Sequence, residues 1–163
     1  GQPLLVRPVP CELDEVVMKV VQELEAQGGR FVVEVTGDLR GQWDPERLAQ
    51  AVTNLLSNAV EHGDGDAPVR VYVEGRATGV RLSVHNRGSI PQDLQAALFE
   101  PFRTTRHPGD RRRGLGLGLY IVHQIVRAHA GTVTVDSDPA RGTTFRIDLQ
   151  RVCHAESGIE CVG

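Results

Sequence analysis

Short alternating segments, joined in pairs by tight turns, constrain the fold of this chain most strongly. Apolar and polar residues alternate over 69–75 and 80–86, with "RATG" between them, and strand-like residues recur at 132–137 and 143–149 around a Pro/Gly turn. Alternation with a period of two is typical of strands with one buried face. Because strands joined by tight turns pair antiparallel, the sequence predicts a mixed or largely antiparallel sheet, to which "RFVVEV" (30–35) adds a strand.

Three amphipathic helices alternate with these strands. Apolar residues from Leu13 to Leu24 follow the i, i+3, i+4 pattern of a helix that Gly28 ends. Asp44 before Pro45 predicts the N-cap of a second helix over 45–62, and a third is expected from Leu119 to about Ala130. Residues 37–44 are expected to form a turn. The expected fold is α/β: a two-layer sandwich in which three helices cover one face of the sheet.

Composition removes several classes of function. The 163 residues suffice for one domain, and the only lysine is Lys19, so the lysine-bearing phosphate loop and the protein-kinase signature are both absent. A net charge of −3 gives no indication of nucleic-acid binding. No apolar run approaches the roughly 20 residues of a membrane span and no signal peptide is evident, so a cytoplasmic domain without direct membrane contact is expected. The question of a membrane-anchored parent protein stays open.

The cysteines and histidines indicate no metal centre. Cys11, Cys153 and Cys161 lack the spacing of metal ligands, and an odd number of cysteines favours a reducing compartment. A disulfide between Cys153 and Cys161 is the alternative. The histidines have no zinc spacing either.

The helix over 45–62 carries a second, polar stripe. Gln50, Asn54, Asn58 and His62 recur every four residues and so share one face. A solvated face is one interpretation, but such faces are usually charged. Asparagine oxygens suit Mg²⁺, which keeps several waters and takes its other ligands from substrate phosphates. A magnesium–phosphate site is therefore the second interpretation.

"GLGLGLYIV" (114–122) alternates glycine with leucine before a helix begins. Backbone amides at a helix N-terminus bind phosphate, and glycines allow a ligand close approach. The spacing does not fit the dinucleotide fingerprint, and a flexible glycine-rich turn is the alternative interpretation. Upstream, "SVHNRGSIP" (83–91) runs from a strand into a loop, and in "LFEPFRTT" (98–105) Phe99 and Phe102 are expected to anchor the next segment to the core.

The segment 103–113 is strongly basic. It holds five arginines against one aspartate, a formal charge of +4. Arginine suits polyphosphate oxygens, although such a run is also typical of solvated surface. Because the segment lacks apolar periodicity, we expect it to form a mobile lid.

These motifs, in this order, resemble the ATP-binding catalytic domain of bacterial sensor histidine kinases, which belongs to the ATPase/kinase superfamily that includes DNA gyrase, mismatch-repair ATPases and a heat-shock chaperone. "DPERLAQAVTNLLSNAVEHG" resembles the N box, "VHNRGSIP" the first glycine box, "LFEPF" the F box, "GLGLGLYIVHQIVRAHAG" the second glycine box, and "GTTF" the closing motif near the adenine. The resemblance covers residues 4–150 and implies a Bergerat-type ATP-binding fold, with ATP and Mg²⁺ as cofactors.

The resemblance assigns roles residue by residue. Asn58 matches the asparagine that coordinates the Mg²⁺ of the bound nucleotide. Asn54 stands where hydrolysing relatives carry a glutamate base, and an amide cannot take up a proton at neutral pH. The expected ATP-binding residues are Asn54, Asn58, His62, Asn86, Gly88, Arg103, Arg106, Gly114, Leu115, Gly116, Leu117, Gly118, Leu119 and Thr143, with Asn58 as the metal ligand.

Two positions depart from the family pattern. Asn86 replaces the aspartate of the first glycine box, and Ser89 stands near its missing second glycine. A neutral acceptor at Asn86 is worth about 1 kcal/mol less than an ionised one, so weaker nucleotide binding is expected. After the metal asparagine the family often has a lysine and then an aromatic residue, whereas this chain has Glu61 and His62.

The expected function is donation of the ATP γ-phosphate to a histidine on a separate helical hairpin, because no histidine in this chain has the phosphoacceptor context. Residues 1–10 are expected to connect to that hairpin, 11–150 to form the catalytic domain, and 151–163 to be a tail. Expected partners are the hairpin of the parent kinase and a response regulator, with the isolated domain monomeric. The alternatives are a degenerate nucleotide-sensing or partner-docking module and a serine kinase of the anti-sigma type; a hydrolysing ATPase of the gyrase type ranks lowest.

Overall fold

The chain folds around a five-stranded mixed sheet. The computed structural model describes residues 4–101 and 117–152. The strand order is β2-β4-β5-β7-β6. Only β2 and β4 pair in parallel; the other neighbours are antiparallel. The strands are β2 (Phe31–Thr36), β4 (Val69–Gly75), β5 (Gly79–Asn86), β6 (Thr132–Asp138) and β7 (Gly142–Gln150).

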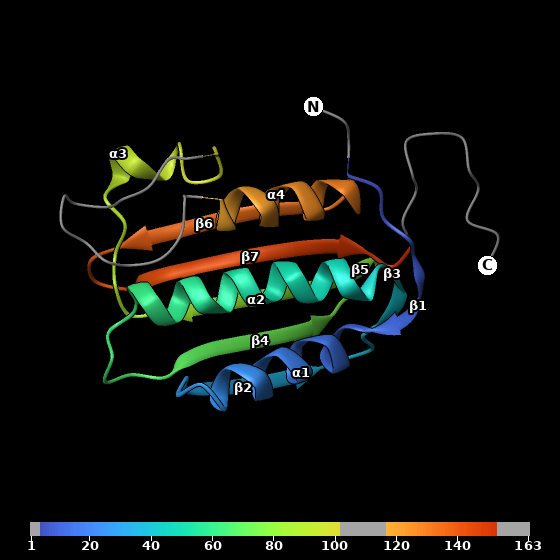
Figure 1. The fold of residues 1–163 in the computed structure, drawn as a ribbon, viewed down its shortest axis with the longest axis horizontal. Helices are drawn as coiled ribbons and strands as arrows, with labels where there is room; N and C mark the ends of the chain where they lie inside the picture. The colour runs from blue at the N-terminus through green and yellow to red at the C-terminus, as the bar shows by residue number, and fades with distance from the viewer. Residues whose placement is uncertain (1–3, 102–116, 153–163) are drawn as a thin grey trace.

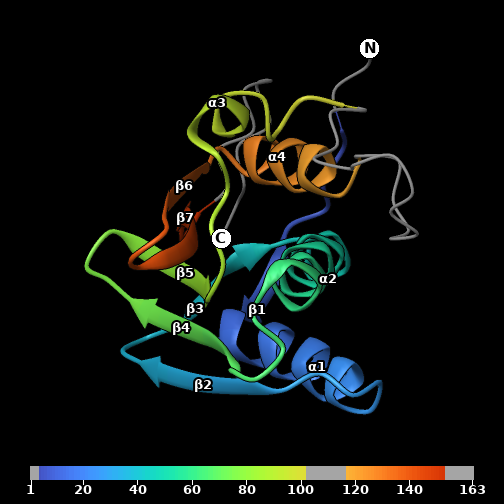
Figure 2. The same ribbon diagram turned by 90° about the vertical axis from the view of Figure 1, so that its left-hand side faces the viewer.

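Three helices cover one face of this sheet, as Figure 2 shows. They are α1 (Leu13–Glu25), α2 (Pro45–His62) and α4 (Gly118–Ala128), and the short α3 (Gln92–Gln95) lies beyond the edge of the helical layer. α2 and α4 pack side by side and run in opposite directions, so the end of α2 and the beginning of α4 lie at the left in Figure 1. The predicted two-layer α/β sandwich is therefore confirmed.

Alternate strand residues face the helices and form the core. Val71, Val84 and Phe145 occupy one cross-strand row, and each is at most 1% exposed. Leu55, Leu56 and Ile125 from α2 and α4 belong to the same core, and none of them is exposed to solvent. Burial of these side chains, about 1.5–3 kcal/mol each, fixes how the helices lie on the sheet.

A second sheet of two strands lies on the right in Figure 1, at the other end of the molecule from the end of α2 and the beginning of α4. β1 (Val9–Glu12) pairs antiparallel with β3 (Arg40–Trp43). The expectation that 37–44 would only turn was therefore wrong. Tertiary contacts hold β3: Gln42 N donates to Arg151 O (2.7 Å) and the fully buried Trp43 donates from Nε1 to Gln150 O (2.8 Å). The sequence "RGQW" has no alternation that would reveal this strand.

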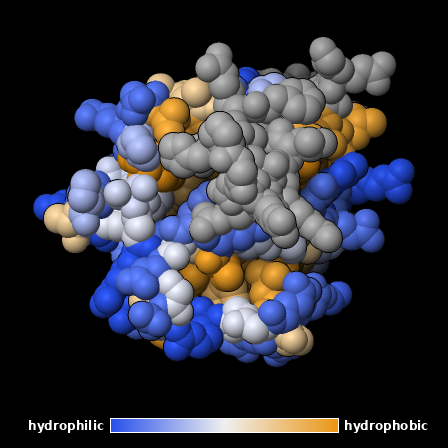
Figure 3. Space-filling view, turned by 60° about the vertical axis from the view of Figure 1, so that its left-hand side comes forward, coloured by the Kyte–Doolittle hydropathy of each residue, from blue (hydrophilic) through white to orange (hydrophobic). Residues whose placement is uncertain are grey.

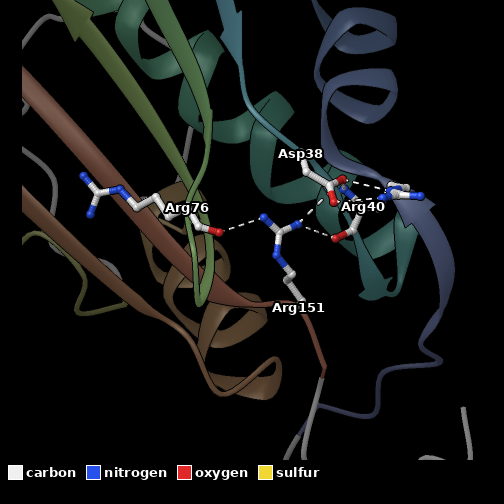
Figure 4. A network of polar contacts seen from close by, with 4 residues as sticks. All are labelled: Asp38, Arg40, Arg76 and Arg151. Atoms are coloured by element: carbon white, nitrogen blue, oxygen red, sulfur yellow. Dashed lines mark hydrogen bonds and ion pairs between the residues drawn. The ribbon is translucent and has the colours of Figure 1, made fainter.

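Arg151 joins this small sheet to the main one (Figure 4). Its guanidinium donates from Nη1 to Arg40 O (2.7 Å) and from Nη2 to Arg76 O (2.8 Å). Arg40 in turn forms a two-point ion pair with Asp38 and lowers the pKa of that carboxyl group to about 2. The end of β7, the start of β3 and the turn after β4 are thereby tied together. No helix within the described ranges is long and apolar enough to span a bilayer.

Candidate functional site

A pocket opens where α2 ends and β5 runs into its following loop. Its cavity has a volume of about 130 Å³, and the free space grows to about 480 Å³ when the open mouth is included. Its lining residues come from α2, the end of β5, the loop 88–91 and the start of β7. They are Asn58, His62, Asn86, Gly88, Ser89, Ile90, Pro91, Thr143 and Phe145. Among the residues coloured in Figure 3, hydrophilic ones predominate on this side of the molecule, with smaller hydrophobic areas between them.

A polar row at the edge of the core includes two residues that line the pocket, Asn86 and Thr143, and a third that does not, Ser137. Asn86 pairs with Thr143, and Thr143 pairs with Ser137 on the next strand. All three lie on the helix-covered side, one row beyond Val84, Phe145 and Val135. Asn86 and Thr143 are 4% and 2% exposed, respectively. The core therefore ends in amide and hydroxyl groups, which can bind the polar edge of a ligand while Phe145 contacts its apolar part.

Gly88 lies tightly between the end of α2 and Thr143. Its φ of +139° belongs to the region that favours glycine, and a Cβ at this position would lie 2.5 Å from His62 O. The Thr143 hydroxyl donates to Gly88 O at 2.8 Å. The Asn86 side chain donates from Nδ2 to Arg87 O at 3.3 Å. The side chains of Thr143 and Asn86 thus both bond to backbone carbonyl groups of the loop after β5.

The polar stripe of α2 faces the pocket only in its last turns. Asn58 is half-buried and lines the pocket, and His62 lines it from a more exposed position. Asn54 is half-buried one turn earlier but is not among the lining residues. Glu61, whose charge would repel phosphate, is exposed and also outside the lining.

The start of α4 lies at the same end of the helical layer. Gly118 begins the helix, one residue before the predicted start, and Leu117 O accepts from Ile121 N (2.8 Å) in its first turn. No atom of the described part of the chain lies within 4 Å of a Cβ placed on Gly118, so its backbone is open to approach. Leu117, Gly118 and Leu119 are not among the pocket-lining residues.

Several predicted ATP contacts lie outside the described residues: Arg103, Arg106, Gly114, Leu115 and Gly116. The same holds for Phe102, for the expected lid (103–113), and for Cys153 and Cys161. Phe99 is described. It stacks on His123 of α4, with ring centroids 5.7 Å apart, and meets Phe145 edge-on at 6.2 Å. The predicted anchoring of "LFEPF" to the core is confirmed for Phe99.

A buried histidine joins α2 to α4 at the end away from the pocket. His129 has no exposed surface; Asp44 N donates to its Nε2 (3.1 Å), and its Nδ1 lies 2.8 Å from Ile125 O. Because Nε2 accepts, the ring is neutral with its proton on Nδ1. Burial lowers the pKa of His129 below its ordinary value, despite the opposing effects of the Ile125 carbonyl and Asp44.

Asp44 caps α2 as the sequence predicts. Its Oδ1 accepts from Arg47 N (3.1 Å) and its Oδ2 from Arg7 N (2.9 Å), so the same carboxylate also holds the segment before β1. Burial alone would raise the pKa of Asp44, but these backbone N–H groups lower it overall. The cap and His129 together fix how α4 lies against α2, whose other end lines the pocket.

The donor set at the pocket fits a magnesium-bound phosphate ligand. Asn58 offers an amide oxygen, and Mg²⁺ takes one or two protein ligands while waters and phosphate oxygens complete its shell. Within 4–101 and 117–152, no cluster of three or more His, Cys, Asp or Glu side chains could hold a metal ion by itself.

Sequence reasoning had not selected four of the lining residues: Ser89, Ile90, Pro91 and Phe145. They lie within motifs that the sequence revealed, but their orientation depends on how the loop returns over β7. Ser137, which belongs to the polar row, was missed as well. Its signal was present, because Ser137 follows Val133 and Val135 at two-residue spacing and is therefore a polar residue on the apolar side of its strand.

Comparisons with known proteins agree with this geometry. The family model for histidine kinase-, DNA gyrase B-, and HSP90-like ATPases matches residues 43–152. A bacteriophytochrome of Pseudomonas aeruginosa is 40% identical over 140 residues, which cover 83% of this chain and 19% of that protein. The sensor protein VanS of Enterococcus faecium is 33% identical over 128 residues, 78% of this chain and 33% of VanS. The chain thus spans a third or less of these relatives.

Solved structures with the same fold include whole catalytic domains. The catalytic domain of the histidine kinase ThkA superposes with a TM-score of 0.75 at 28% identity, covering 90% of this chain and 97% of that domain. The mycobacterial sensor histidine kinase MprB gives 0.74 at 29% identity, covering 91% and 100%. The resemblance inferred from the motifs is confirmed, and the histidine kinase interpretation is favoured over the degenerate module and the serine kinase.

Proposed function

Because the chain belongs to the family of histidine kinase-, DNA gyrase B-, and HSP90-like ATPases, we propose that it binds Mg-ATP in this pocket and donates the γ-phosphoryl group to a histidine on a separate domain. The observation that carries the proposal is the convergence of Asn58, Asn86 and Thr143 on one pocket from α2, β5 and β7. The family binds ATP; the metal, the acceptor and the contacts of this chain are the proposed part.

The base occupies the part of the pocket beside the polar row, and the phosphates extend toward the helix ends. Asn86 Oδ1 accepts a hydrogen bond from the adenine amino group, with Thr143 beside it in the same row. The beginning of α4 supplies backbone N–H groups, which favour phosphate through hydrogen bonding and the helix dipole. Arg103, Arg106 and the glycines Gly114 and Gly116 are proposed to bind the phosphates.

Asn58 would hold the metal ion. When bound, Mg²⁺ would neutralise phosphate charge and favour attack on the γ-phosphoryl group. Asn58 contributes its amide oxygen, and His62 contacts the nucleotide from the last turn of α2. Because Asn54 carries an amide where a base would be needed to activate water, the site holds ATP for an incoming histidine instead of hydrolysing it.

The phosphoacceptor histidine and the protein that receives the phosphoryl group from it lie outside residues 11–150. The proposed partners are the phosphoacceptor hairpin of the parent kinase, reached through residues 1–10, and a response regulator. The domain itself is proposed to be a monomer. VanS is named a sensor protein and ThkA a histidine kinase, which supports a two-component pathway for this chain.

Calorimetry with ADP and a non-hydrolysable ATP analogue, with Mg²⁺ and with a chelator, tests the proposal. We expect Mg²⁺ to strengthen binding to the wild type and to have little effect on Asn58→Ala, because the replacement removes the protein ligand of the ion. Gln50→Ala is the matched control: Gln50 is an exposed amide two turns earlier on the same stripe, and its loss should leave binding unchanged.

Equal Mg²⁺ dependence in the wild type and Asn58→Ala would show that the metal role is wrong. No binding of any adenine nucleotide to the wild type would overturn the proposed function as a whole.

A further inference from the structure

The loop that forms the pocket wall is held by a residue that does not line the pocket. Ile90 N donates to Ser137 Oγ at 2.8 Å, and Ser137 Oγ lies 2.7 Å from Thr143 Oγ1. Thr143 Oγ1 in turn donates to Gly88 O at 2.8 Å. Ser137 is on β6, about 50 residues along the chain from the loop, so this link exists only in the folded molecule.

The direction of each bond follows from the number of hydrogens. Each hydroxyl group has one hydrogen to donate. Gly88 O can only accept, so the hydrogen of Thr143 is used there, and Ser137 must donate its own to Thr143 Oγ1. A single directed chain therefore runs from Ile90 N–H through Ser137 and Thr143 to the Gly88 carbonyl.

This series of hydrogen bonds attaches the loop at two points, Gly88 O and Ile90 N. Gly88 and Ile90 lie on either side of Ser89, and all three line the pocket. Gln95 of α3 adds a second attachment: its Nε2 donates to Ile90 O (2.9 Å) and to Ser137 O (3.2 Å). On its far side the loop abuts the end of α2, because a Cβ on Gly88 would meet His62 O at 2.5 Å.

We propose that Ser137 is a positioning residue for the nucleotide base: by donating to Thr143 and accepting from Ile90, it holds the loop 88–90 and the Thr143 hydroxyl in the geometry that binds the base. The inference rests on the proposed function. Ser137 itself does not contact the ligand and acts through Thr143 and the loop. Hydrogen bonds of this kind strengthen one another because each donor in the chain is polarised by the next.

Removing the Ser137 hydroxyl leaves Ile90 N–H and Thr143 Oγ1 each without one partner. We therefore expect Ser137→Ala to weaken ADP binding about tenfold, with Ser137→Thr restoring most of the affinity because it keeps a hydroxyl group on Cβ. The loss should be equal with Mg²⁺ and with a chelator, since the loop serves the base and not the phosphates. This separates it from Asn58→Ala, whose effect depends on the metal.

The experiment measures the dissociation constant of ADP by calorimetry and the free energy of unfolding by denaturant titration, both on the full chain. Thr134→Ala is the control: Thr134 is an exposed hydroxyl on the same strand, facing away from the helices, and its loss should leave ADP affinity unchanged. Slowed exchange of the Ile90 amide in the wild type, lost in Ser137→Ala, would support the bond independently of ligand.

Unchanged ADP affinity in Ser137→Ala, with only a lower stability, would reduce Ser137 to a structural residue and overturn the inference. A loss that appears only with Mg²⁺, or an Ile90 amide that exchanges freely in the wild type, would also overturn it. In each of these cases the wild type still binds ADP, so the proposed function stands; failure of the wild type to bind ADP is the separate result that would remove both.

Discussion

Single residues at the mouth of the pocket have little freedom to change. Gly88 combines a φ of +139° with a backbone oxygen 2.5 Å from its missing Cβ. Its neighbours Ser89 and Pro91 line the pocket from the same loop. Unlike Gly88, neither of them has a positive φ. Backbone shape at one residue thus sets where the others point.

Replacing Gly88 by alanine should therefore unfold the loop or displace the end of α2. We expect a loss of roughly 1–3 kcal/mol in the free energy of unfolding, together with weaker nucleotide binding. Gly65→Ala is the matched control, because no described atom lies within 4 Å of a Cβ there and its φ is not positive; its effect should stay within about 0.5 kcal/mol. Denaturant titration measures the free energy of unfolding of both variants. Equal stability of the two would contradict the steric argument.

At the scale of elements, α2 and α4 pack side by side. The end of α2 and the beginning of α4 lie at the same end of the helical layer, where Asn58 and His62 of α2 line the pocket. At the other end, one buried hydrogen bond, from Asp44 N to His129 Nε2, links the two helices. The rigid end fixes the angle between the helices, and the open end leaves room for a ligand.

This arrangement predicts a pH dependence of stability. The pKa of His129 is lowered in the folded protein, so the unfolded chain, with a histidine pKa of about 6.5, binds the proton more tightly. The stabilisation is fully present above that value and is lost as the pH falls from it toward the lowered pKa of the folded state. Burial also lowers the pKa of His85 and His123, so they contribute with the same sign.

His129→Gln isolates the contribution of this one histidine. Between pH 7.5 and 5.5 the free energy of unfolding should fall in the wild type and fall less steeply in the variant, by at most the one-proton slope of about 1.4 kcal/mol per pH unit. The carboxylate of Asp44, whose pKa is lowered, acts in a separate window below pH 3.9. Identical slopes in the two proteins would mean that His129 does not titrate on unfolding.

For the whole molecule, the pocket and the segment before β1 lie at opposite ends of the helical layer. Trp43 and Arg151 bond β3 to the end of the main sheet. β1 and β3 lie at the right of Figure 1, and the end of α2, which lines the pocket, lies at the left. The segment that would lead to an acceptor domain is therefore not part of the pocket. Under the proposed function, the acceptor histidine would therefore reach the pocket from outside residues 11–150.

Phosphotransfer should consequently require a second component. The chain alone should hydrolyse ATP far more slowly than about one turnover per second, an ordinary enzymatic rate. Adding the phosphoacceptor hairpin of the parent kinase should produce acid-labile phosphate on the hairpin, and Asn58→Ala should abolish it. Steady hydrolysis near that rate without an acceptor would contradict the role given to Asn54, and binding of ATP without any transfer would favour a nucleotide-sensing module.

The helices and most strands could be predicted from the sequence because their signals are local. The Asp44–Pro45 cap signal placed α2 at 45–62, the spacing of apolar residues gave the first residue of α1, and alternation located β4 and β5. β1 and β3 could not be predicted, because "RGQW" has no periodicity and its strand depends on bonds to residues about 110 positions away. Periodicity also could not reveal that β2 pairs in parallel with β4.

Some residues of the candidate site could likewise be predicted from the sequence, and others could not. The types of its residues followed from motifs, and Asn58, His62, Asn86, Gly88 and Thr143 do line one pocket. Asn54 shares the stripe of Asn58 but not the pocket, because the helix leads this face toward the cavity only in its last turns. Ser137 contributes through contacts that no spacing within the motifs encodes.

The sequence by itself determined which segments become helices and strands, which chemical groups the site contains and which family the chain belongs to. These properties depend on local periodicity and on residue identity, both of which can be read along the chain. Only the tertiary structure decided the order of the strands, the polar row at the edge of the core and the hydroxyl chain that holds the pocket loop. Those features depend on hydrogen bonds and packing between distant segments, and the chain must close on itself before such contacts exist.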